Sequence, residues 1–219
     1  MDEYKTISGI SETNLIVKKS RFIGLSTSVS SMSFALDSST LDTAFALPST
    51  RQTSQEINDF LDYAQSEYPK ASHYCYAYSI SLGDQKREYS SDAGEPTHSA
   101  GPPILAAINS SGLNNIICVV IRYFGGIKLG IGGLIRAYGR CAKECLKSAT
   151  IETRICHQTF YIHTPYQHLG AVLNISHKLQ ARIVDVVCDE EARITLQIRQ
   201  SMIDALREGL SISEEIVIT

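Results

Sequence analysis

The chain has 219 residues, of which 43% are hydrophobic and 20% are charged, and its formal net charge at pH 7 is −3. This composition predicts a globular protein with one large domain or two ordinary ones. No apolar run approaches the roughly 18 residues of a membrane-spanning helix, and the N-terminus lacks the basic and apolar regions of a signal peptide. We therefore expect no membrane association and a cytoplasmic location.

The six cysteines are scattered along the chain without any Cys-x-x-Cys pair. Cys141 and Cys145 would share one helix face, where they pack as small apolar side chains. The sequence therefore supports neither a disulfide framework nor a zinc site, and it predicts no metal and no cofactor.

The charge is unevenly distributed. Residues 151–219 contain six Lys and Arg against nine Asp and Glu, whereas residues 1–150 contain 14 of each class. Residues 118–150 have a basic excess, with only Glu144 opposing the basic side chains Arg122, Lys128, Arg136, Arg140, Lys143 and Lys147. One basic segment in a nearly neutral region indicates a local interaction surface.

The first 115 residues predict alternating strands and helices. Residues 30–51, rich in Ser and Thr, predict a surface excursion. Before it, the periodicity predicts two short strands through about Val29, with a turn at residues 18–20. After it, the pattern predicts a helix over Gln52–Tyr68 and strands over Tyr74–Leu82 and Lys86–Tyr89, joined by a turn at Gly83–Asp84. A further helix begins at Pro102 and Pro103 and ends at Gly112.

The most informative stretch is Cys118–Arg140. The β-branched run that begins at Ile116 predicts a strand buried on both faces. The next segment, residues 125–133, contains five glycines, a density that is tolerated where φ is positive or the backbone approaches another segment closely. Such a loop before a helix suits an anion, and the alternative is a tight turn without a ligand.

A helix is predicted from about Gly133 to Ala149. At about 100° per residue, its apolar side carries Leu134, Tyr138, Cys141, Cys145 and Ala149. The opposite side, called the basic face below, carries Arg136, Arg140, Lys143 and Lys147. Such a face is either simply solvated or, together with the glycine-rich loop, contacts a phosphate-bearing partner.

After Thr150 the predicted order is strand, helix, strand, strand, helix, strand. This βαββαβ order is the split-βαβ or ferredoxin-like pattern. It predicts a second domain at 151–219 after a first domain at 1–150. The predicted elements are strands at Thr159–His163, Arg182–Cys188, Arg193–Arg199 and Glu215–Ile218, with helices from Pro165 and over Met202–Leu210.

The run Arg122–Gly130 (RYFGGIKLG), with Gly132, Gly133 and Arg136, resembles the signature of the YigZ/IMPACT family. The resemblance covers about residues 4–149. Other residues that match the family motifs, and that it implies form a functional surface, are Arg21, His73, Asp92, Gly94, Glu95, Pro96, Tyr123 and Phe124. The anion-binding or nucleic-acid-binding candidates are Arg122, Gly125, Gly126, Lys128, Gly130, Gly132, Gly133, Arg136, Arg140, Lys143 and Lys147.

The resemblance implies an α+β protein. Its first domain would be a β-sheet with helices on one face, similar to the second domain of a small-subunit ribosomal protein and shared with translational GTPases. Its second domain would resemble a late domain of elongation factor G. The eukaryotic relative is a translation regulator. Together with the basic face and the glycine-rich loop, this indicates RNA, the ribosome or a translation-related protein as the partner. A monomer is expected.

The chain departs from the family pattern at three places. Ala93 stands where a second Asp is usual, Pro102 stands where Arg is usual, and Thr97-His98-Ser99 replaces Ser-Gly-Thr. The loss of one carboxylate and one guanidinium together indicates a lost ion pair, or a site with less charge for chemistry.

The catalytic candidates are His73, Asp92 and Glu95, since carboxylates with histidine suit acid–base work. Asp92 and Glu95 alternatively cap a turn or helix, or pair with Arg122. No dinucleotide fingerprint, Walker A, HExxH or GxSxG motif is present. Three hypotheses stay open: a non-enzymatic translation-associated factor, which we favour, a hydrolase of small molecules or phosphate esters, and a protein-interaction adaptor.

Overall fold

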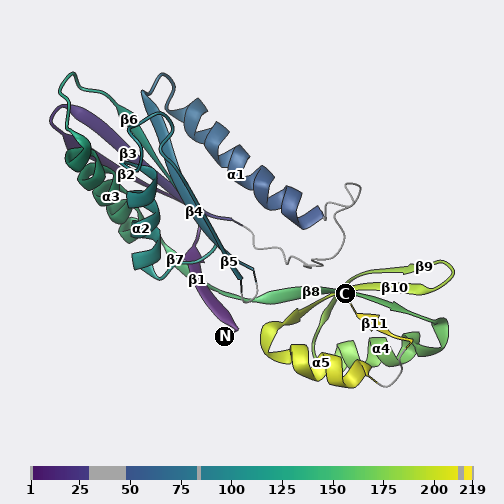
Figure 1. Ribbon diagram of the computed structural model, residues 1–219. Coiled ribbons are helices and arrows are strands. Elements are labelled where there is room, and N and C mark those ends of the chain that lie inside the picture. The colour runs from purple at the N-terminus through teal and green to yellow at the C-terminus, as the bar shows by residue number, and fades with distance from the viewer. Residues whose placement is uncertain (1, 30–47, 83–84, 212–214, 219) are drawn as a thin grey trace. The chain divides into compact units, whose positions relative to one another are not determined.

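The computed structural model describes residues 2–29, 48–82, 85–211 and 215–218 (Figure 1). They form two compact units, the first built mainly from Tyr4–Ser31 and Thr50–Arg154 and the second mainly from Ile155–Thr219. Most of the predicted surface excursion at 30–51, and the turn at Gly83–Asp84, lie outside the described residues.

The first unit contains a five-stranded antiparallel sheet in the order β2-β3-β6-β4-β5. Its strands are β2 (Ile10–Val17), β3 (Ser20–Ser28), β4 (His73–Leu82), β5 (Gln85–Ser91) and β6 (Ile116–Tyr123), and its helices are α1 (Pro48–Glu67), α2 (Gly101–Ser111) and α3 (Ile131–Ser148). A separate two-stranded ladder joins β1 (Glu3–Ile7) to β7 (Ile151–Ile155), so the residues that follow α3 still belong to the first unit.

Strand β6 is buried on both faces, as predicted. Cys118 and Val120 face a core that α2 and α3 cover, whereas Val119 and Ile121 face a second core that includes Phe60 of α1. Figure 1 shows α1 on one side of the sheet and α2 with α3 on the other. The prediction of helices on one face is therefore wrong, because a central strand that is apolar on both faces needs cover on both.

Helix α3 has the predicted amphipathic arrangement. Leu134, Tyr138, Cys141 and Cys145 are buried, and the whole basic face is exposed. The helix begins at Ile131, two residues earlier than predicted, so Gly132 and Gly133 lie in its first turn. Glycine is needed at residue 133, since a Cβ there would lie 2.9 Å from the Cβ of Leu129.

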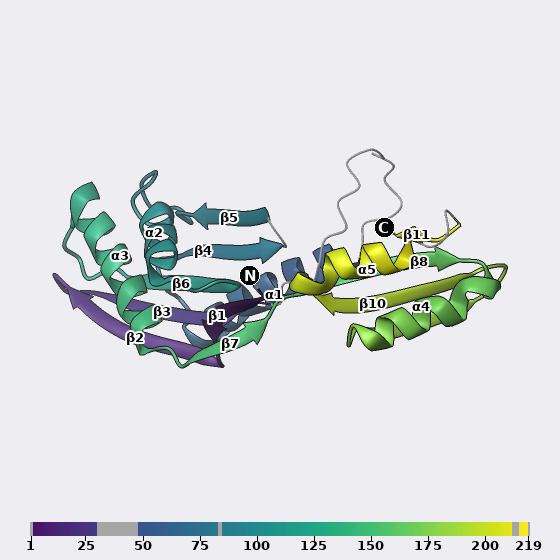
Figure 2. The ribbon, with the colours of Figure 1, turned by 90° about the horizontal axis from the view of Figure 1, so that it is seen from below.

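The second unit has the predicted βαββαβ order. Its elements are β8 (His157–Thr164), α4 (Tyr166–Lys178), β9 (Arg182–Cys188), β10 (Ala192–Arg199), a 3-10 turn (Gln200–Met202), α5 (Ile203–Leu210) and β11 (Val217–Ile218). The sheet order is β11-β8-β10-β9, with antiparallel neighbours, and the last strand is shorter than predicted. Both helices cover one face of this sheet (Figures 1 and 2).

None of the helices in the described ranges has the length and the apolar character that a membrane-crossing segment requires.

Replacing Phe60 tests the second core directly. Phe60→Ala removes a ring that is 7% exposed, and we expect it to lower the free energy of unfolding by about 3–5 kcal/mol. Gln65→Ala on the exposed side of the same helix should change it by less than about 0.5 kcal/mol. Urea unfolding followed by circular dichroism measures both. Equal, small effects would contradict the packing of α1 on the sheet.

Candidate functional site

The candidate site begins at one end of the five-stranded sheet. Arg122, near the end of β6, is paired in register with Phe22 of β3 and His73 of β4. Backbone pairing across three adjacent strands therefore brings residues 49 to 100 positions apart into one row. The turn at residues 18–19 and the loops 92–100 and 124–130 meet here, and we call this region the loop end of the first unit.

Arg122 is a buried cation with a buried partner. Its side chain is 6% exposed, and its Nη1 donates to Oε1 of Glu95 at 2.5 Å, where the Glu95 side chain is 3% exposed. The guanidinium carbon lies 5.5 Å from the ring centre of Phe22 and 5.4 Å from that of Phe124. The Nε of Arg122 has no hydrogen-bond partner among the described residues.

Glu95 also collects contacts from two other elements. Tyr138 of α3 donates its hydroxyl to Oε1 of Glu95 at 2.8 Å, and Nε2 of His73 lies 3.9 Å from the same oxygen. Burial raises the pKa of Tyr138 far above its ordinary value, so this hydroxyl stays protonated and can donate. Nδ1 of His73 lies 3.0 Å from the carbonyl oxygen of Ala93. Glu95 thus joins a loop, two strands and a helix.

Asp92 is a helix cap. Its carboxylate accepts from the backbone N–H groups of Ala100 and Gly101, each at 2.8 Å, and of His98 at 2.7 Å. Partial burial acts to raise the pKa of Asp92, but the three backbone donors outweigh it and hold the pKa below its ordinary value. Ala100 and Gly101 stand at the start of α2, where the helix dipole also favours a carboxylate, and His98 lies in the loop before it.

The three catalytic candidates therefore have structural partners. His73 and Glu95 are close together, whereas the Asp92 carboxylate is directed to the α2 N-terminus. Cys75, whose thiol donates to the carbonyl of Asp92, is also buried, and burial raises its pKa to about 12. In the described ranges, no group of three or more His, Cys, Asp or Glu is placed to hold a metal ion.

The glycine-rich loop depends on a close backbone contact. A Cβ on Gly125 would lie 2.0 Å from the carbonyl oxygen of Lys19, so no other residue fits there without movement. Lys18 and Lys19 form the two-residue turn between β2 and β3, and both have positive φ, 44° and 68°. The N–H of Gly125 also donates to Oγ of Ser20 at 3.2 Å. The prediction of close approach is confirmed here, and Gly126 and Gly130 have positive φ.

Most other family-motif residues are at the same loop end. Tyr123 donates its hydroxyl to the carbonyl of Pro69, the ring of Phe124 is 49% exposed, and the exposed Arg21 is paired with Tyr123 across β3 and β6. Gly94 and Pro96 flank Glu95 on the exposed part of its loop.

The basic face runs along α3 away from this cluster. Lys143 and Lys147 are exposed, and Arg140 forms an i,i+4 ion pair with Glu144 at 2.7 Å. Arg136 folds back over the first turn, with Nη1 3.6 Å from the Cβ position of Gly132. Lys128 is exposed in the loop before the helix. Glu144 thus reduces the positive charge at the centre of the face.

Sequence reasoning missed several residues of the loop end. Ser20 and Tyr138 hold the cluster together, and Lys18 with Lys19 stand beside the glycine-rich loop. Tyr138 was assigned to the apolar side of its helix, and nothing in the sequence shows that its hydroxyl meets Glu95. For the lysines the available signal was their position between two predicted strands, but lysine is not a typical residue for a turn with positive φ.

The two departures near the cluster have different surroundings. Ala93 has φ of 43°, a left-handed conformation that Asp and Asn adopt more readily than Ala. Pro102 is a partly buried residue in the first turn of α2, where proline is well tolerated. The absence of an Asp at position 93 and of an Arg at position 102 leaves neither Glu95 nor Arg122 without an ionic partner, because these two side chains pair with each other.

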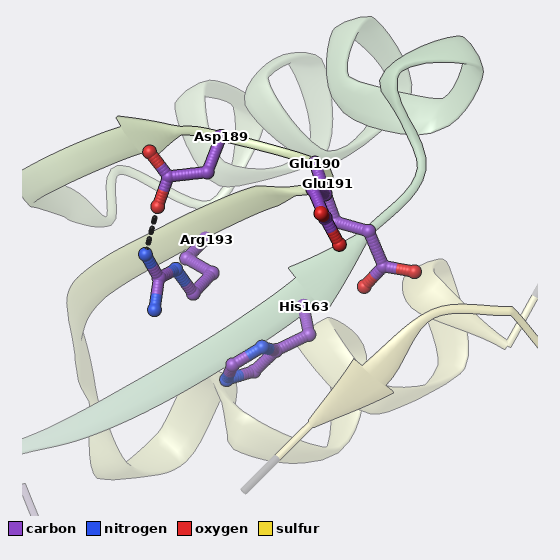
Figure 3. A pocket seen from close by; sticks show the side chains of 5 residues that line it. All are labelled: His163, Asp189, Glu190, Glu191 and Arg193. Carbon is purple, nitrogen blue, oxygen red and sulfur yellow. Dashed lines mark hydrogen bonds and ion pairs between the residues drawn. The ribbon is translucent and has the colours of Figure 1, made fainter.

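A surface pocket lies on the second unit, far in sequence from every predicted site residue. It is lined by His163 of β8, Arg193 of β10 and the bend Asp189–Glu191 (Figure 3). His163 and Arg193 are neighbours in register, and Arg193 is ion-paired with Asp189.

The buried pair can be tested against an exposed one. Glu95→Gln leaves the Arg122 charge buried without a counter-charge, so we expect the free energy of unfolding to fall by about 3–5 kcal/mol. Glu144→Gln breaks the pair with Arg140, which is 66% exposed, and should cost only about 0.3–0.5 kcal/mol. Urea unfolding at pH 7 compares them, and similar losses would refute the structural role of Glu95.

Asp92 makes stability depend on pH. Its pKa is lowered in the folded state, so its contribution is complete above the unfolded-state pKa and is lost as pH falls through the folded-state pKa. We expect Asp92→Asn to cost about 1 kcal/mol at pH 7. That difference from the wild type should begin to shrink below about pH 4, where the carboxyl group of the unfolded wild-type chain becomes protonated first. Unfolding free energies measured from pH 7 to pH 3 check this, and a constant difference would argue against it.

Comparison with known proteins identifies relatives of this chain. The Impact N-terminal domain model matches residues 43–146. An IMPACT family member of Haemophilus influenzae is 34% identical over 67% of this chain and 72% of its own length. The Escherichia coli member YigZ is 31% identical over 64% of this chain and 68% of its own length, and the Bacillus subtilis member YvyE is 28% identical over 96% and 87%.

One solved structure supports the fold. The crystal structure of a hypothetical protein aligns with 100% of this chain and 97% of its own chain, at 22% identity and a TM-score of 0.70. The α+β architecture in two units is thus shared with a known structure. The signature residues at the loop end and the identities with its relatives agree, and the chain belongs to the IMPACT family.

Proposed function

We propose that this protein is a non-enzymatic, translation-associated regulatory factor that binds RNA, at the ribosome, through the basic face of α3 and the glycine-rich loop. The link to translation comes from the family resemblance, since the eukaryotic relative is a translation regulator. The observation that carries the RNA-binding part is the row of exposed cations on one side of α3, with Lys128 also exposed in the preceding loop.

The geometry of this surface suits a phosphate backbone. Lys143 and Lys147 stand one turn apart on α3, and neither forms an ion pair within the described part of the chain. Lysines on a solvated helix face gain little from the fold itself, whereas phosphate contacts release counterions and gain free energy. Arg140 is partly neutralised by Glu144, so Arg136, Lys143 and Lys147 are the residues we expect to contact phosphates.

The acid–base alternative has less support. A general base needs a lone pair that can reach a substrate proton. Oε1 of Glu95 already accepts from Arg122 and Tyr138, and the Glu95 side chain is only 3% exposed. Asp92 accepts three backbone hydrogen bonds. We therefore do not carry the hydrolase hypothesis forward.

The finer assignments of fold and setting belong to the same proposal. The βαββαβ order of His157–Ile218, with the sheet order β11-β8-β10-β9, supports a ferredoxin-like fold for the domain that we propose at 151–219. Its first strand, β7, pairs with β1 of the first unit. We assign residues 1–150 to the ribosomal-protein-like first domain, and we propose a monomer that acts in the cytoplasm.

The decisive experiment measures the salt dependence of RNA binding. Fluorescence anisotropy with labelled oligouridylate, between about 50 and 200 mM KCl, should give a linear fall of log K with log salt. Arg136→Ala/Lys143→Ala/Lys147→Ala should reduce the slope by about 2, because each lost phosphate contact with a single strand removes about 0.7.

A control variant with the same loss of charge separates a local from a general effect. Lys5→Ala/Lys178→Ala/Arg182→Ala removes three exposed cations from other parts of the chain. It should leave both the affinity and the slope nearly unchanged. Absence of RNA binding at about 50 mM KCl, or equal slopes for the two triple variants, would reject the proposal.

A further inference from the structure

The loop end also exposes aliphatic side chains that the basic face does not explain. Ile131 and Ile135, in the first turns of α3, are 59% and 41% exposed, and Ile127 in the preceding loop is 41% exposed. Residues four apart lie on the same side of a helix, so Ile131 and Ile135 form one apolar strip. By helical geometry the centre of this strip lies about 130° around α3 from the centre of the basic face.

The strip is continued by apolar groups of α2. Gly139, one turn beyond Ile135, lies against α2, since a Cβ on it would be 3.6 Å from the Cβ of Pro103. Pro102 and Pro103 are only partly buried. Aliphatic side chains in adjacent turns, with proline next to them, make a surface whose burial is favourable only against another apolar group.

The charges around the strip are positive. Lys128 precedes it, Arg136 follows Ile135, and neither forms an ion pair within the described residues. The first turn of α3 contains no acidic residue, and Gly130 provides no side-chain cap. The two carboxylates of the adjoining loop are already used, Asp92 on the α2 backbone and Glu95 on Arg122.

We propose that this strip, Ile127, Ile131 and Ile135 with Lys128 and Arg136, is the docking site for an acidic amphipathic segment of a partner protein. Apolar side chains of the segment, spaced three or four residues apart, would cover the isoleucines. Its Asp and Glu side chains would meet Lys128, Arg136 and the open N-terminus of α3. The site shares Arg136 with the basic face, but its isoleucines lie on another side of α3, so variants of the isoleucines test it independently of RNA binding.

Other anionic partners fit the strip less well. Single-stranded RNA stacks its bases on aromatic rings, and the strip consists of isoleucines. An anionic membrane attracts clusters of several basic side chains, whereas the cations that we assign to the strip are two, Lys128 and Arg136. A protein segment that combines carboxylates with aliphatic groups matches both parts of the surface.

The test is selection from a random-peptide phage library on the full chain. Enriched peptides should combine Asp or Glu with apolar residues three or four positions apart. Ile131→Ser/Ile135→Ser should weaken their binding at least about tenfold, and Lys128→Ala/Arg136→Ala should weaken it and reduce its salt dependence. Ile16→Ser/Ile151→Ser, which alters two isoleucines of the same unit that are 73% and 55% exposed, should leave it within about twofold.

Several outcomes would overturn the proposal. These are the enrichment of no peptide beyond a parallel selection on the Ile131→Ser/Ile135→Ser variant, the enrichment of peptides without acidic residues, and equal losses in both isoleucine pairs. Binding of oligouridylate or of phosphatidylglycerol vesicles that is lost in Ile131→Ser/Ile135→Ser but kept in Ile16→Ser/Ile151→Ser would assign the strip to RNA or lipid instead.

Discussion

The first unit depends on one buried positive charge, the guanidinium of Arg122, which needs a negative partner. Arg122 is placed inside the fold by its position in the central strand, where its side chain is only 6% exposed. A buried guanidinium is costly unless a carboxylate and further hydrogen bonds surround it. Glu95 meets that need, and its loop is in turn fixed by Asp92 on the helix that follows. The electrostatic requirement of one residue thus determines the conformation of a loop.

The same requirement ties several segments together at the loop end, although this region is rich in turn formers. Tyr138 reaches Glu95 from α3, and Ser20 approaches both Arg122 and the backbone of Gly125. Four segments that are distant in sequence therefore share one polar cluster. We expect surfaces that such a cluster supports to bind through preformed contacts rather than through a loop that orders on contact.

Much of this architecture could be predicted where one local pattern dominates. The β-branched run at Ile116–Ile121 predicts a strand that is buried between two layers. The helical periodicity of α3 places Tyr138 and Arg140 on opposite sides of the helix. The side of the sheet that α1 covers was predicted wrongly, because amphipathicity shows that a helix packs but not on which face. The roles of Asp92 and Glu95 were left open, since a carboxylate in a loop has the same sequence signature whether it caps, pairs or catalyses.

The cluster also has a consequence for how the chain folds. Its contacts join residues far apart in sequence, from 27 positions for Glu95 with Arg122 to 105 for Ser20 with Gly125. Closing such long loops costs entropy before any contact is gained, so contacts of this kind form late and slow the folding reaction. The β2–β3 hairpin can form early from local pairing, but its turn gains its contact with Gly125 only when β6 has joined the sheet. We therefore expect the polar cluster at the loop end to be completed among the last steps of folding.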